Sequence, residues 1–126
     1  MKRAGLVLML LLAACAGGAA RNQALLLSMR VPFQSIVADV ERGMAARVLD
    51  GVEAAKVRVL ISDVRTVLES GDRDGLRGLD WPLLRDLAME GIQDRLTTGE
   101  IGAGVAASML ERLRLFGESW AVALNR

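Results

Sequence analysis

Apolar side chains recur at gaps of three and four residues along most of this chain, which is the spacing of one face of an α-helix. The first clear stripe follows Pro32, a residue that suits the first turn of a helix because its missing N–H needs no partner there. Its members are Phe33, Ile36, Val37, Val40, Met44 and Val48. The pattern predicts an amphipathic helix that begins near Pro32 and ends near Asp50.

A second apolar stripe does not continue the first one. It contains Val57, Leu60, Ile61, Val64 and Leu68. In one unbroken helix, with a rotation of about 100° per residue, this stripe would lie on roughly the opposite side from the first. Asp50 and Gly51 stand between the two stripes and favour a break. We therefore predict two helices with a turn near Gly51, with one long bent helix as the alternative.

The C-terminal half predicts two more helices. Asp80, Trp81 and Pro82 form a typical helix start, in which a carboxylate caps free amide groups and the proline occupies the first turn. The third helix should run to about Leu96 and bury Leu84, Leu87, Ala88 and Ile92. The fourth carries a stripe on which Trp120 is the largest residue: Val105, Ala106, Met109, Leu113, Phe116, Trp120 and Leu124.

The glycine-rich segment from Gly71 to Leu79 is predicted to be a solvated connector. Its oxygen donors, with the residue that follows it, are Asp72, Asp74 and Asp80. A helix-loop-helix calcium site needs an oxygen ligand at its fifth position and a glycine at its sixth, where this chain has Leu76 and Arg77. We therefore expect no metal site in this connector.

Four amphipathic helices with short connectors predict an all-α fold, a small up-and-down helical bundle of about four helices. The chain has 126 residues, with two phenylalanines, two tryptophans and no tyrosine, so the core should be mainly aliphatic. This length suits one small domain with a single core.

The N-terminus has the order of a secretory signal: Lys2 and Arg3, an apolar run, and then small residues before the only cysteine. The sequence that closes this run is Leu12, Ala13, Ala14 and Cys15. It resembles the lipobox of bacterial lipoproteins. The resemblance implies acylation of the Cys15 sulfur, cleavage just before this residue and acylation of the new amine. The chain then divides into a signal peptide (1–14), a lipidated flexible tether (15–23) and one helical domain (24–126).

Three other interpretations of this segment remain open: a secretory peptide cut elsewhere, an uncleaved membrane anchor, and a buried apolar helix. The uncharged stretch from Ala4 to Ala20 falls short of the roughly 20 predominantly apolar residues of a spanning helix. Two or three acyl chains hold a protein stably at a bilayer, because each buried methylene contributes about 0.8 kcal/mol. Ala16 follows the cysteine, where enteric lipoproteins of the inner membrane tend to carry aspartate. By analogy we expect the outer membrane, with the domain facing the periplasm.

Charge and composition exclude several classes of function. Removal of the signal peptide takes away Lys2 and Arg3 and leaves fourteen basic against fifteen acidic residues, so bulk charge favours no nucleic-acid partner. The chain has no histidine, and its one cysteine would be acylated. Zinc sites, disulfides and histidine-dependent catalytic triads are therefore excluded, and we expect no cofactor.

Asp86, Glu90 and Asp94 repeat at four-residue spacing on the outer side of the third predicted helix. Like charges at this spacing repel one another by a few tenths of a kcal/mol per pair. Arg85 and Arg95 stand nearby, so we expect a solvated face that is neutralised locally. The alternative is an acidic surface for binding a basic partner.

The sequence favours a non-enzymatic envelope protein, held at the membrane by lipid on Cys15, that binds or assembles another envelope protein. The layout is similar to that of pilotins, small helical outer-membrane lipoproteins that bind a secretin tail, but only by analogy of layout. A phage-encoded envelope lipoprotein that acts in lysis or exclusion is one alternative. A cell-wall hydrolase is another, because a pair of carboxylates is the one catalytic device that this composition permits. Self-association in a purely structural role is a third.

Overall fold

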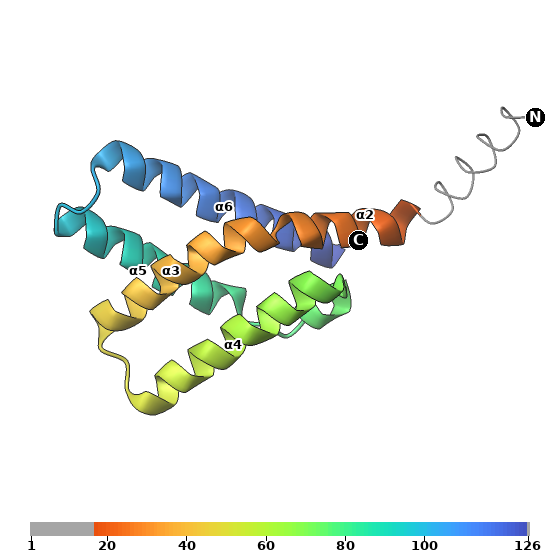
Figure 1. Cartoon of the computed structure of the whole chain (residues 1–126), viewed down its shortest axis with the longest axis horizontal. Coiled ribbons are helices and arrows are strands. Elements are labelled where there is room, and N and C mark those ends of the chain that lie inside the picture. Colours follow the sequence, from red (N-terminus) through yellow and green to blue (C-terminus); the bar gives the residue numbers. More distant parts are fainter. Residues whose placement is uncertain (1–16, 126) are drawn as a thin grey trace, which may run out of the picture.

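Five α-helices and a short 3₁₀ helix make up residues 17–125, the part of the chain that the computed structural model describes (Figure 1). They are α2 Gly17–Ser28, α3 Arg30–Arg47, α4 Gly51–Ser70, η1 Arg73–Leu76, α5 Trp81–Thr97 and α6 Ala103–Asn125. No strand occurs in this range. The predicted all-α bundle is therefore confirmed, with one helix more than the four expected.

The additional helix is α2, and it begins inside the segment that the sequence assigned to a flexible tether, residues 15–23. Residues 17–23 are helical, and α2 lies in line with α3, from which it is separated only at Met29 (Figure 1). Leu26 and Met29 are both buried. Burial of Leu26 and Met29 packs the C-terminal part of α2 into the bundle. The division into signal peptide (1–14), tether (15–23) and domain (24–126) stays a prediction.

The predicted break between the first two apolar stripes is confirmed at residues 48–50. Val48 ends α3 in the left-handed conformation, with φ 53° and ψ 56°. Asp50 then begins the next helix, because its Oδ1 accepts a hydrogen bond of 2.8 Å from the N–H of Glu53. The predicted third helix start is confirmed in the same way, since Oδ1 of Asp80 accepts from the N–H of Leu83 at 3.1 Å.

Helices α3 and α5 touch backbone to backbone. A Cβ placed on Gly43 would lie 1.8 Å from the carbonyl oxygen of Leu87, and one placed on Gly91 would lie 1.9 Å from that of Asp39. No side chain fits at either position, so both glycines are required by this approach. Figure 1 shows α5 crossing behind α3, with α4 and α6 on opposite sides of this central pair.

The four aromatic residues of the chain form one cluster where α3, α5 and α6 meet. The Phe33 ring lies 5.7 Å from that of Phe116, Trp81 lies 5.0 Å from Phe116, and the two tryptophan rings are 5.4 Å apart. All four residues are buried, including Trp120 as predicted. Contacts between aromatic rings at these separations stabilise a core beyond simple burial. This cluster fixes α6 against the α3–α5 pair.

Most of each predicted stripe is buried, with some exceptions. Leu84, Leu87, Ala88 and Ile92 of α5 are buried as expected. Val48 and Val105 were expected on buried faces, but they are 84% and 54% exposed. Val48 is the C-cap residue that follows α3, and Val105 lies in the first turn of α6.

Alanine at the α3–α5 contact should destabilise the bundle. We expect Gly43→Ala and Gly91→Ala each to lower the free energy of unfolding by about 3 kcal/mol or more, because the new methyl group would overlap a backbone carbonyl. Gly104→Ala, with no atom within 4 Å of the added Cβ, is the matched control and should be neutral or slightly stabilising. Urea unfolding followed by circular dichroism measures the difference. Equal stability of Gly43→Ala and Gly104→Ala would contradict the contact.

Asp39 is buried beside this contact, 3.3 Å from Nη1 of Arg95. Burial raises the pKa of its carboxyl above the ordinary value, and the nearby charges of Arg95 and Arg112 offset this only in part. The folded protein therefore binds this proton more tightly than the unfolded chain does. The contribution of Asp39 to stability must then fall as the pH rises from the ordinary aspartate pKa through the raised one.

The substitution Asp39→Asn replaces this carboxyl with an amide that cannot ionise, so it should remove this loss of stability. We expect the stability of the variant relative to the native chain to increase as the pH rises through that acidic window, in urea unfolding at several pH values. Glu41→Gln, at an exposed carboxylate on the same helix, serves as the control. A variant whose relative stability instead falls with rising pH would show that the ion pair with Arg95 outweighs burial.

Candidate functional site

A groove with a volume of about 640 Å³ lies between α5 and α6. We call it the α5–α6 groove, and its lining residues are Trp81, Arg85, Met89, Leu110, Leu113, Arg114, Gly117, Glu118 and Ala121. Most of its lining surface is apolar. Its volume falls within the range of about 300 to 1,000 Å³ that is usual for ligand sites in proteins.

Trp81 forms one end of the groove because of two local features. The cap made by Asp80 starts α5 at this residue, which places the indole beside α6. Gly117 leaves room for it, since a Cβ at that position would lie 3.0 Å from Nε1 of Trp81. The indole therefore lies against the backbone of α6, and the absence of a side chain at Gly117 keeps the groove open.

Two uncovered apolar side chains form the walls of the groove. Met89 of α5 is 46% exposed and Leu110 of α6 is 43% exposed, while Leu113 beneath them is buried. Single exposed apolar residues are common on protein surfaces, but a concave set with a buried floor is typical of a binding site. The groove therefore presents an apolar surface that is exposed to solvent and that a partner could cover.

The charged residues at the edge of the groove are already paired. Arg114 donates hydrogen bonds to Glu111, at 2.9 Å from its Nε, and to Glu118. These bonds raise the pKa of Arg114, and the bond from Arg114 lowers the pKa of Glu111. Arg85 lies 3.2 Å from Asp86. Such exposed pairs add little to stability, but they leave the groove edge with little net charge to select a partner.

The acidic residues predicted on the third helix lie mainly along the seam between α3 and α5. Glu90 is 2.6 Å from Nε of Arg47, and Asp94 is 2.6 Å from Nε of Arg42. Hydrogen bonds with these carboxylates raise the pKa of both arginines, with Glu100 also contributing at Arg42. The charges of Glu90 and Asp94 are thus neutralised by the neighbouring helix, whereas the sequence pattern pointed to arginines of their own helix. Asp86 accepts a hydrogen bond from Arg85, and its charge also contributes to the raised pKa of Arg47 on α3.

The lipobox residues Leu12, Ala13, Ala14 and Cys15 lie outside the described residues, so the lipid anchor stays a prediction. Between residues 17 and 125, no helix combines the length and the apolar character needed to cross a bilayer. Within the same range, no group of three or more potential metal ligands comes together.

No family model, curated protein or solved structure matches this chain. The geometry of the described residues therefore carries the functional proposal. The α5–α6 groove itself was not predicted from the sequence. The available signal was the pair Met89 and Leu110, which stand off the stripes of their helices, together with Gly117 in the middle of a helical pattern.

Proposed function

We propose that this chain is a lipid-anchored, non-enzymatic envelope protein whose α5–α6 groove binds an amphipathic helix of another envelope protein. The uncovered apolar surface formed by Met89 and Leu110 over buried Leu113 supports this proposal most directly. Binding of a partner helix by its apolar face is a common way to cover such a surface.

The dimensions of the groove suit a short helix. From Trp81 to Met89 the wall on α5 spans about 12 Å, and from Leu110 to Ala121 the wall on α6 spans about 16 Å, at about 1.5 Å per residue. This length accommodates two to three helical turns. A partner segment should therefore present apolar side chains at positions i, i+3 or i+4, and i+7.

The position of α2 agrees with an anchored role. This helix begins at Gly17, two residues after Cys15, and runs in line with α3 (Figure 1). Acyl chains on Cys15 would hold the start of α2 near a bilayer. Figure 1 shows the connection between α5 and α6 at the opposite end of the bundle from the start of α2. Met89 lies at the middle of α5 and Leu110 in the first half of α6, and the groove runs from there to Trp81 and Ala121, toward the end of the bundle at which α2 begins.

The charge pairing in the groove also favours binding over hydrolysis. A glycan hydrolase needs two carboxylates facing each other across its cleft. Glu118 is the one carboxylate among the residues that line the α5–α6 groove, and Arg114 donates a hydrogen bond to it. This observation supports the non-enzymatic proposal.

Photocrosslinking in cells tests the groove. A photoreactive residue at Leu110 should yield one discrete crosslinked product, and mass spectrometry should map the crosslink to an amphipathic helix of an envelope protein. Met89→Asp in the same chain should reduce the yield at least tenfold, because a carboxylate would be buried by an apolar partner. A product that Met89→Asp leaves unchanged would contradict the proposal.

Val59 of α4 supplies the matched control for both changes. Its side chain is 59% exposed and does not line the groove. A photoreactive residue at Val59 should give no comparable product, and Val59→Asp should leave the product at Leu110 unchanged. An equal loss with Val59→Asp would show that the reduction is not specific to the groove.

Cys15→Ser tests the anchor separately. We expect this variant to keep its signal peptide and to lose acylation, because the resemblance to a lipobox makes the cysteine sulfur the site of the first acyl chain. Labelling with a radioactive fatty acid and mass spectrometry of the purified protein measure both properties. Normal processing and normal lipid labelling of Cys15→Ser would show that the assignment is wrong.

A further inference from the structure

The indole N–H of Trp81 donates no hydrogen bond to any residue between 17 and 125. Trp81 lines the α5–α6 groove and is 8% exposed. Within the same range, the one fully buried side-chain nitrogen or oxygen without a partner is Nη1 of Arg73. Nε1 of Trp81 is therefore not fully buried, and the small exposed part of this side chain includes its N–H.

Gly117 leaves this N–H open to the groove. A Cβ at position 117 would lie 3.0 Å from Nε1 of Trp81 and 3.5 Å from Cε2. Any residue larger than glycine would therefore cover the nitrogen side of the ring. Because Gly117 and Trp81 both line the groove, the free donor lies at its surface, at the end that Trp81 forms.

The charged groups around this donor already have partners. Arg114 donates a hydrogen bond to Glu118, and Arg85 donates one to Asp86. The N–H of Trp81 is thus a neutral donor without a partner in a lining that is otherwise apolar or paired. A helix that covers the groove would remove water from this N–H, and a buried donor without an acceptor weakens binding.

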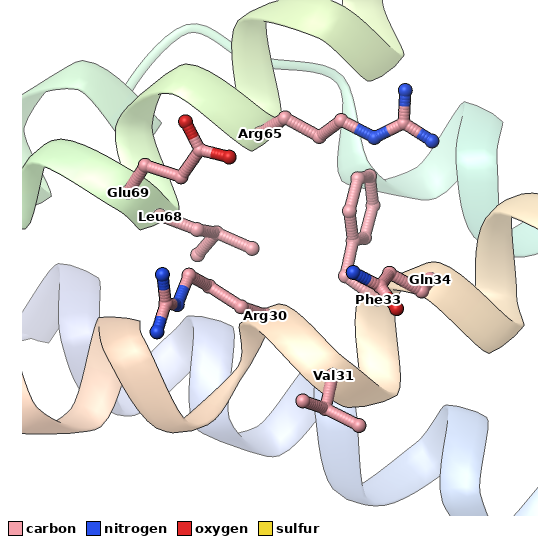
Figure 2. A pocket seen from close by; sticks show the side chains of 7 residues that line it. All are labelled: Arg30, Val31, Phe33, Gln34, Arg65, Leu68 and Glu69. Atoms are coloured by element: carbon pink, nitrogen blue, oxygen red, sulfur yellow. The ribbon is translucent and has the colours of Figure 1, made fainter.

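The hollow between α3 and α4 has no comparable arrangement (Figure 2). Phe33 and Leu68, the core residues of its lining, are 1% and 0% exposed and offer a ligand almost no surface. Figure 2 shows the side chains of Arg30 and Arg65 extending toward opposite ends of this hollow. Its polar groups therefore do not converge on an exposed apolar surface, whereas the α5–α6 groove has a free donor beside one.

We propose that the partner helix in the α5–α6 groove presents one neutral hydrogen-bond acceptor, a Gln, Asn, Ser or Thr side chain, to the indole N–H of Trp81. This inference rests on the proposed function and adds the residue that determines which helices bind. Carbonyl groups in the middle of a helix are already bonded within it, so the acceptor must be a side chain. A carboxylate is less suitable, because Glu118 also lines the groove and repels negative charge.

Selection from a peptide library on the full chain in detergent micelles tests this preference. The probes are helices of about 14 residues in which positions i, i+4, i+7 and i+11 of one face are randomised. We expect the selected helices to carry apolar residues at three of these positions and Gln, Asn, Ser or Thr at the fourth. Binding should be lost with Met89→Asp, because the site is the groove.

The outcomes separate this inference from the proposed function. Helices that are apolar at all four positions, or that carry Asp or Glu at one of them, would overturn the inference, and loss of their binding with Met89→Asp would still support the groove. Selection of no helix, or binding that Met89→Asp leaves unchanged, would overturn the proposed function and this inference together.

Nuclear magnetic resonance of the isotope-labelled chain observes the donor directly. The chain has two tryptophans, so it gives two indole N–H signals, and Trp81→Phe assigns them. A selected helix should move the proton signal of Trp81 downfield, because a hydrogen bond deshields the proton. The signal of Trp120, which does not line the groove, is the internal control and should stay in place. Saturating binding without a downfield shift at Trp81 would contradict the proposal.

Paired changes in peptide and protein measure the coupling between donor and acceptor. Replacing the acceptor of a selected helix by an apolar residue of similar size, Gln by Met or Thr by Val, should weaken binding to the native chain about tenfold. Trp81→Phe and Gly117→Ala, which remove or cover the N–H, should each abolish this difference. Val59→Asp, outside the groove, should preserve it. Equal binding of the two peptides to the native chain would overturn the inference.

Discussion

The backbone contact between α3 and α5 is the constraint on which the rest of this structure depends. Gly43 and Gly91 bring each helix against a main-chain carbonyl of the other, so the distance between the two axes has no freedom to vary. Helices α4 and α6 then lie on opposite sides of this pair (Figure 1). The aromatic cluster on α3, α5 and α6 requires this spacing, because Trp81 reaches both Phe116 and Trp120 only when α5 is held close.

The same contact determines which charged side chains form ion pairs between helices. Because α3 and α5 are so close, their long side chains meet across the seam, and Arg42 and Arg47 neutralise Asp94 and Glu90 there. The opposite side of α5 carries the α5–α6 groove, whose charges are paired locally. The ion pairs between helices are thus concentrated along this seam, and the α5–α6 groove keeps an apolar lining.

The sequence predicted the positions of the helices better than it predicted which helices pack against each other. Periodicity and the Asp80 cap located four helices, α3 to α6, and much of the core, because these signals depend on a few residues that are close along the chain. In the sequence, Gly43 is only a residue of low helix propensity inside the first predicted helix, although a Cβ there would lie 1.8 Å from the carbonyl oxygen of Leu87 on α5. Its role could not be predicted, because a glycine that breaks a helix and one that admits a second backbone have the same local pattern. The α5–α6 groove could not be predicted either, because it is lined by side chains from two helices, and local periodicity does not show how two helices pack.

The continuity of α2 with α3 connects the proposed anchor to the proposed binding site. A flexible tether would let a bound lipid and the groove move independently, and the partner would then meet the groove over a wide range of distances. Burial of Leu26 and Met29 packs the C-terminal part of α2 into the bundle, in line with α3. A lipid two residues before this helix would restrict the height of the groove above the bilayer. Restriction of this kind raises the effective concentration of the groove that a partner in the same membrane encounters. A small apolar groove of modest intrinsic affinity is then enough for binding.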